Sequence, residues 1–373
     1  MSKARDLANF SDVAPDIGRK NLIINGAMQV AQRGTSATGV TTSGVYVVDR
    51  FTNNVVDTAE FTISQSTTAP TGFASSLKWE NTTANASPLS GYYATLNQRI
   101  EGQNLQHLKY GTSDAQSVTL SFWVRSNKTG TYVAELLQPD ASSRHINKSY
   151  TINSADTWEQ KTITFEGDTS GVINNDNGVG LIVSWFFNAG SGYTSGTLQT
   201  SWGALDQTAR AVGQVNLADT VGNTFYITGV QLEVGSVATP FEHRSYGEEL
   251  AACMRYYLRM NPTGNYTRYA DGYWASADLA TVNVYFPVPM RTNPALDDTG
   301  VASDYIIITG SSVNNLTSLP SFSKATQTSD GSCIFANLTA ASTGNGVAGQ
   351  ATQLTSLAGG NWVGDFLGFD AEL

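Results

Sequence analysis

The sequence contains little charge. Only 14% of its 373 residues are Asp, Glu, Lys or Arg, roughly half the share of an ordinary globular protein. With 21 Lys and Arg against 31 Asp and Glu, the net charge is −10. The chain therefore lacks the basic surface with which proteins bind phosphate backbones, which excludes nucleic acid as a partner.

Cysteines and long apolar runs are also scarce. The two cysteines, Cys253 and Cys333, are too few for a disulfide framework. The longest apolar run, residues 180–187, is less than half of a membrane span. The first residues carry no hydrophobic stretch typical of a signal peptide. We therefore expect synthesis in a reducing cytoplasm and no membrane insertion.

Small polar residues and aromatic rings take the place of charge. Thr, Ser, Asn and Gly make up over a third of the chain, and these residues favour turns and short strands over helix interiors. The 15 Phe, 16 Tyr and 7 Trp are too many for a disordered chain. The composition predicts a folded, all-β protein.

Residues 1–20 are polar and too short to form a domain. A weak amphipathic turn ends at Pro15. We expect an N-terminal docking arm held by a partner, and the alternative is a frayed terminus.

Residues 21–246 have the pattern of consecutive strands. Apolar side chains at even positions from 118 to 124 alternate with polar or aromatic ones, the period of a half-buried strand. Asn177-Gly178 is a hairpin turn signal. About ten such segments without a helical period predict an antiparallel jelly-roll sandwich. The other expected strands are Leu181–Phe187, Val45–Phe51, Ala59–Ile63, Leu77–Trp79, Tyr93–Ile100, Tyr132–Leu136, Trp158–Phe165 and Thr224–Val234.

The pattern changes after residue 246. Ser245–Glu248 is a capping box that predicts a short helix over residues 249–253. We assign residues 247–260 to a connector of helix and strand. Residues 261–373 then form a second, smaller β-sandwich domain, with expected strands at Val282–Phe286 and Tyr305–Thr309.

One strand face presents residues suited to a sugar. Trp123 and Arg125 share the face opposite the apolar positions, and a flat ring beside a guanidinium fits the C–H faces and hydroxyls of a saccharide. The alternative is that a loop or a neighbouring subunit covers the tryptophan. Further rings lie in Gly/Ser-rich segments and either face a ligand or pack beneath the loops: Tyr92, Tyr193, Trp202, Tyr273 and Trp274.

Catalytic and metal-binding patterns are weak. The three histidines, His107, His145 and His243, have no ligand-like spacing. Asn174–Gly178 carries one carboxylate, so a hairpin is favoured over a calcium loop. Gly344–Gly349 matches a phosphate-loop pattern but lacks the flanking strand and helix, which favours a surface loop. We expect no enzyme activity, no metal and no cofactor.

Two stretches point to a known family. Residues 21–34, NLIINGAMQVAQRG, are followed by YVVDRF at 46–51, and residues 225–250 run from FYITGVQLEVGS to SYGEEL ahead of Cys253–Tyr257. These stretches, with FPVPMRTNP at 286–294, resemble a bacteriophage tail-fibre or virion structural protein family. The first domain is also similar to carbohydrate-binding jelly-roll modules, many of which bind calcium near its first and last strands. The matching positions here, Gln29 and Thr228, are neutral, and the calcium is not carried over.

The resemblance implies a tail fibre or appendage in the virion. Residues 1–20 would bind other virion proteins, the chain would form a homotrimer, and its function would be adhesion to host surface polysaccharide. The alternatives are a structural decoration or adaptor protein without a receptor, and a polysaccharide depolymerase.

If the arm is attached to the particle, the host-binding surface is expected beyond Asn261. Its stacking rings would be Tyr269, Tyr273 and Trp274, and its negative charge suits a neutral polysaccharide. The competing site is the jelly-roll face with Trp123 and Arg125.

Overall fold

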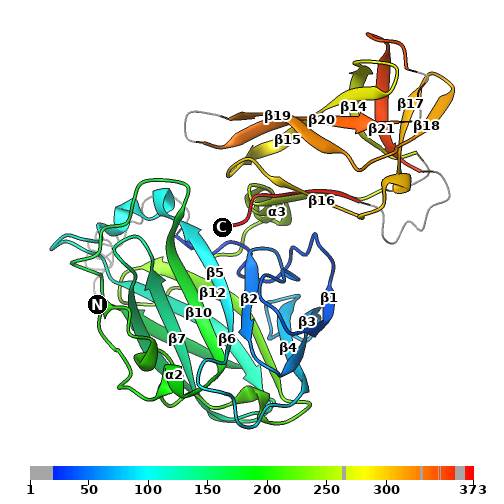
Figure 1. The fold of residues 1–373 in the computed structure, drawn as a ribbon. Helices are drawn as coiled ribbons and strands as arrows, with labels where there is room; N and C mark the ends of the chain where they lie inside the picture. The colour runs from blue at the N-terminus through cyan, green and yellow to red at the C-terminus, as the bar shows by residue number, and fades with distance from the viewer. Residues whose placement is uncertain (1–19, 263–265, 328–330, 343, 345, 358–365) are drawn as a thin grey trace. The chain divides into compact units, whose positions relative to one another are not determined.

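The computed structural model describes residues 20–262, 266–327, 331–342, 344, 346–357 and 366–373 (Figure 1). The chain divides into two compact units, Met1–Ser245 and Tyr246–Leu373. The helix and strand expected as a connector over residues 247–260 fall within the second unit. The expected arm, apart from Lys20, lies outside the described residues.

The first unit consists of two six-stranded antiparallel sheets. Sheet I has the strand order β1-β3-β4-β12-β6-β9, and sheet II has the order β11-β8-β7-β10-β5-β2. The strands of sheet I are β1 (Ser36–Val40), β3 (Glu60–Ser66), β4 (Ser76–Thr83), β6 (Val118–Ser126), β9 (Glu159–Phe165) and β12 (Thr224–Val234). The strands of sheet II are β2 (Phe51–Val56), β5 (Tyr93–Glu101), β7 (Gly130–Gln138), β8 (Arg144–Ile152), β10 (Val179–Ala189) and β11 (Gly203–Ala204). This confirms the predicted jelly-roll sandwich.

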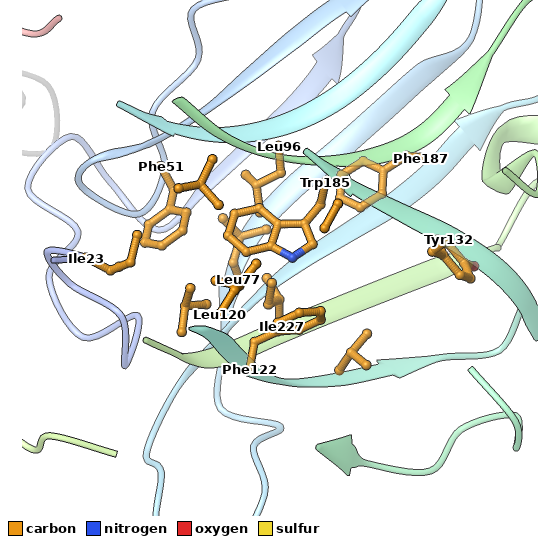
Figure 2. Close-up of a cluster of buried hydrophobic side chains, with 14 of the residues drawn as sticks. Ile23, Phe51, Leu77, Leu96, Leu120, Phe122, Tyr132, Trp185, Phe187 and Ile227 are labelled. Carbon is orange, nitrogen blue, oxygen red and sulfur yellow. The ribbon is translucent and has the colours of Figure 1, made fainter. Parts of the chain in front are cut away.

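Side-chain alternation along the strands builds the core between the two sheets. Trp185 of sheet II is fully buried, and its ring meets Phe122 of sheet I edge-on at 5.8 Å between centroids. Figure 2 shows these rings among aliphatic side chains from both sheets. Because strand residues alternate between faces, the residues next to each core residue in the sequence point to the outer face of their sheet.

Two local predictions are corrected. Only Phe51 of the expected strand Val45–Phe51 lies in a strand. The carboxylate of Asp49 accepts hydrogen bonds from Gln32, and Arg50 has a φ of 71°, so the chain turns here. Asn177-Gly178 is not a hairpin turn, because the strands on either side, β9 and β10, belong to different sheets.

Short helical turns fill the connections of the first unit. They are η1 (Gly102–Asn104), η2 (Gln106–Leu108), α2 (Ser191–Thr194), η3 (Gln207–Ala209) and η4 (Leu217–Asp219). Three of them, α2, η3 and η4, belong to the long segment between β10 and β12. The part with α2 and η3 borders the candidate site described below.

The second unit begins with the predicted helix, α3 (Tyr246–Met254). Sheet III has the order β13-β22-β16 and sheet IV the order β18-β17-β21-β14-β15-β20-β19. Residues of both sheets, such as Phe369 and Val282, share one core, which confirms the predicted smaller β-sandwich. The bounds are β13 (Tyr257–Met260), β14 (Arg268–Trp274), β15 (Leu279–Met290), β16 (Ala295–Asp298), η5 (Ala302–Asp304), β17 (Tyr305–Thr309), β18 (Ser312–Asn315), β19 (Ser321–Gln327), β20 (Cys333–Ala341), β21 (Ala351–Ser356) and β22 (Leu367–Asp370).

Candidate functional site

The outer face of sheet II carries a row of polar side chains that crosses five strands. The register aligns each residue with the next, strand by strand, and the row is Thr52 (β2), Asn97 (β5), Ser184 (β10), Glu135 (β7) and Asn147 (β8). We call it the polar row. Because cross-strand partners lie on the same face of a sheet, all five residues lie on the outer face of sheet II.

Side chains on both sides of the polar row turn it into a groove. The pocket at its centre has a volume of about 60 Å³, enough for only a few water molecules, so the ligand-accessible part is shallow. The residues that line it are Asn54, Tyr93, Thr95, Asn97, Arg99, Glu135, Leu137, Ile182, Ser184 and Arg210.

Several floor side chains have no internal hydrogen-bond partner. Asn97 is 4% exposed and Ser184 is 3% exposed. Within the described part of the chain, neither side chain makes a hydrogen bond, and the same holds for Asn54 and Thr95. All four side chains line the pocket, so water or a ligand there is the partner of their polar groups.

The far half of the row is tightly bonded. Glu135 is fully buried, and Arg210 donates to both of its carboxylate oxygens, from Nε at 2.8 Å and from Nη2 at 2.5 Å. Asn147 donates to Glu135 Oε2 at 3.1 Å. His145 Nε2 accepts the Asp206 backbone N–H at 3.2 Å, so the proton lies on Nδ1, which donates to Glu135 at 3.3 Å.

These contacts hold Glu135 ionised. Burial acts to raise its pKa, but the charge of Arg210 and the hydrogen bonds from Arg210 and His145 outweigh burial, and the pKa falls to about 2. Glu135 is consequently a fixed anion whose two carboxylate oxygens accept hydrogen bonds from protein side chains. Its role is to anchor Arg210 at the wall of the groove.

Aromatic rings stand at the rim beside this wall. The rings of Tyr93 and Tyr193 lie 4.9 Å apart between centroids. The Arg210 guanidinium lies 5.5 Å from the Phe186 ring centroid and 6.0 Å from that of Tyr193. A groove with amide and hydroxyl groups on its floor and tyrosines at its rim has the chemistry of a saccharide site.

Trp123 and Arg125 lie together on the outer face of the other sheet, sheet I. Both are half-buried. Arg125 donates to the backbone oxygen of Asp156 at 2.8 Å and to its carboxylate at 3.1 Å, and it stacks 5.2 Å from the Tyr226 centroid. A side chain added at Gly229 would lie 3.1 Å from Trp123, so the tryptophan packs on that backbone. The two residues share a face, as predicted. The Arg125 guanidinium is already engaged within the protein, whereas the Trp123 ring is half-buried.

The three rings expected in the second unit do not act together. Trp274 is fully buried and donates from Nε1 to Thr309 at 2.8 Å, Tyr269 is 7% exposed, and Tyr273 is 47% exposed. The expectation that they form one stacking surface is corrected, because these residues lie in β14, not in a loop. Tyr273 and Trp274 are adjacent and point to opposite faces, and a register irregularity between Arg268 and Ala270 leaves Tyr269 in the core with Trp274. Gly346 lies on the Trp274 ring, where an added Cβ would be 2.2 Å from it.

The remaining rings and histidines have structural neighbours. Trp202 donates to the backbone oxygen of Glu166, and Tyr92 borders the same loop as Tyr193 through its backbone bond with Gly190. His243 packs on Phe73 and Phe241, and His107 is exposed. Among the residues that the structure describes, no group of three or more His, Cys, Asp or Glu is placed to hold a metal ion. No helix in the described ranges is long and apolar enough to cross a membrane.

The groove residues were not among the sequence candidates, apart from Tyr193. A signal exists in β5, where Tyr93, Thr95, Asn97 and Arg99 alternate with core positions and are all polar or amphipathic. The link from Glu135 to Arg210 has no sequence signal, since 75 residues separate the two.

Comparisons with known proteins found no matching family model and no matching curated protein. Solved structures do match. Tailspike protein 4 of bacteriophage CBA120, in its enzymatically active domain, is 12% identical over 58% of this chain, with a TM-score of 0.30, and the match covers 21% of that protein. A family 11 carbohydrate-binding module from Clostridium thermocellum is 10% identical over 55% of this chain and 99% of its own, with a TM-score of 0.29. The module TmCBM61 is 8% identical over 58% of this chain and all of its own, with a TM-score of 0.28.

Proposed function

We propose that the groove of sheet II binds a glycan and that the chain is an adhesive virion protein of a bacteriophage. The observation that carries the glycan proposal is the set of polar side chains that line the pocket without a protein partner, above all Asn97. Sugar hydroxyls both donate and accept hydrogen bonds, so a saccharide on the floor would replace water as the partner of these groups.

The virion proposal has a different support. It rests on the resemblance of residues 21–51 and 225–257 to the tail-fibre family. In that setting residues 1–20 would attach to other virion proteins, and a homotrimer would multiply weak contacts with the host surface. A structural decoration or adaptor protein remains the second candidate, and it differs by having no glycan ligand.

We propose binding without hydrolysis. Glycoside hydrolysis requires a pair of carboxyl groups, one of them with a raised pKa. Among the residues that line the groove, Glu135 is the one carboxylate, and its pKa is lowered to about 2. Release of reducing sugar from a bound polysaccharide would overturn this part of the proposal.

The test is an array of bacterial capsular polysaccharides and O-antigens probed with the full chain. We expect binding to a subset of glycans, and roughly tenfold weaker binding by Asn97→Ala. The control is Asn283→Ala, the same substitution on the outer face of sheet IV. An array without bound glycans would refute the glycan function, and equal binding by Asn97→Ala would refute the groove as its site. Deletion of residues 1–20 tests the virion role, because we expect a folded protein that no longer joins particles.

A further inference from the structure

The polar row is covered at one end. Residues 190–211, which we call the cover segment, lie over the last two strands of the row. The Asn147 backbone N–H donates to the backbone oxygen of Gln199 at 2.7 Å, and the Asn147 side-chain amide donates to the backbone oxygen of Arg210 at 2.7 Å. Gln199 in turn donates to the backbone oxygen of His145 at 3.0 Å. Asn147 and His145 are consequently fully buried.

The cover segment is anchored by packing as well as by charge. Ala211 is fully buried against Val133 and Phe186 of sheet II, with Tyr193 and Leu198 packed around them. The Arg210 guanidinium is held by Glu135 on one side and by Gln207 at 3.0 Å on the other. Arg210 therefore forms a fixed end wall across the groove between β10 and β8.

The opposite end of the row is not closed in this way. The pocket lining reaches the edge strand β2 at Asn54, which is half-exposed. The neighbouring residues 41–44, which hydrogen-bond to β2, are exposed, and Val56 at the end of that strand is 45% exposed. The accessible floor thus runs across three strands, from Asn54 of β2 to Ser184 of β10, a length of about 10 Å at the usual strand spacing.

A glycan that lies along this floor meets the Arg210 wall after a few sugar rings and cannot continue. We infer that the groove binds the terminal residues of a glycan chain and does not accept an internal stretch of a long polysaccharide. This inference rests on the proposed function, and it specifies which part of the glycan the groove recognises. Its physical basis is steric: the wall is a buried ion pair, and displacing it would leave Glu135 as an unpaired buried charge.

The experiment measures stoichiometry against chain length. The probe is the array polysaccharide that binds most strongly, cut by mild acid into fractions of defined length, and the full wild-type chain is titrated by calorimetry. Recognition of chain ends predicts one binding site per glycan chain at every length, with an affinity that stops rising after the shortest fractions. Internal recognition predicts a number of sites that grows with length, and that result would overturn the inference while leaving the glycan function intact.

A second measurement uses short fractions blocked at one terminus. We expect a bulky group at one end to weaken binding at least tenfold and the same group at the other end to leave it nearly unchanged. Equal tolerance of both blocked ends would contradict the end wall. Asn97→Ala, tested with the unblocked fraction, should weaken binding roughly tenfold, which shows that the signal comes from the groove. If the array holds no bound glycan, the proposed function fails and the inference fails with it.

Discussion

Each of the two units carries a row of polar side chains across the outer face of a sheet, but the two rows differ in their exposure to solvent. In the first unit the polar row is nearly buried and ends at the Glu135–Arg210 ion pair. In the second unit the corresponding row is open to solvent or half-buried, and its residues, aligned by register across sheet IV, are Gln353, Asp271, Asn283 and Asn337.

The surroundings of the two rows explain the difference. The cover segment narrows the first row to a pocket of about 60 Å³, whereas the depression beside Asp271 and Gln353 has a volume of about 430 Å³. The second row is bordered by exposed rings, with Tyr273 at 47% and Tyr285 at 73% exposure. Register alone therefore creates a polar row, and the connection that packs over it decides whether it becomes a preorganised site or a solvated face.

The largest effect that we expect comes from breaking the anchor of the first row. Glu135→Ala leaves Arg210 partly buried without its partner, and we expect the first unit to lose about 3–5 kcal/mol of stability. The matched control is Asp271→Ala, because this carboxylate is 68% exposed and its pairing with Arg268 at 3.6 Å is loose. We expect a change within about 0.5 kcal/mol there. Chemical denaturation of both variants tests the contrast, and equal losses would show that the two rows are energetically alike.

The next effect concerns acid. The pKa of Glu135 is about 2 in the folded protein against a usual 4.5, so its contribution to stability is complete above pH 4.5 and is lost as the pH falls toward 2. The shift corresponds to a contribution on the order of 3 kcal/mol. We expect Glu135→Gln to remove this part of the pH dependence. The measurement is the free energy of unfolding of wild type and variant between pH 2 and 6, and parallel curves would contradict it.

A smaller effect separates binding from stability. Asn97 makes no hydrogen bond within the described part of the chain, so Asn97→Ala should change stability by less than about 1 kcal/mol. Glycan affinity should fall roughly tenfold, because the amide loses its hydrogen bonds to sugar. Thermal unfolding measures the change in stability, and titration with the glycan selected on the array measures the change in affinity. A large loss of stability together with unchanged affinity would assign Asn97 a structural role.

The smallest effect tests the open face of the second unit. Tyr285 is 73% exposed and touches Phe335 at 5.5 Å between ring centroids. We expect Tyr273→Ala combined with Tyr285→Ala to change stability by no more than about 1 kcal/mol and to leave glycan binding nearly intact. Loss of cell or glycan binding in this variant would instead place the receptor surface beyond Asn261, as expected if residues 1–20 attach to the particle.

Several features of the fold follow from local sequence. Alternation of apolar and polar residues in β6 and β12 predicts two-faced strands, and the capping box at Ser245 predicts α3. Prediction failed where a tertiary contact controls the backbone. Residues 45–50 have strand-forming valines, yet Asp49 is bonded to Gln32 and the chain turns. The error at Trp274 has a different origin, since its Gly-rich surroundings concealed strand β14, whose buried face holds the ring.

The sequence by itself determined the fold class, because a period of two residues is a local property that any strand must show. It also determined that Trp123 and Arg125 share a face, since strand alternation requires it. Only the tertiary structure decided which face holds the groove. Strand order and register bring Asn97, Ser184 and Glu135 into one row from distant parts of the chain, and the packing of the cover segment places Arg210 at its end. Such contacts depend on how the sheets assemble and on which connection covers them, and no periodicity in the sequence encodes that choice.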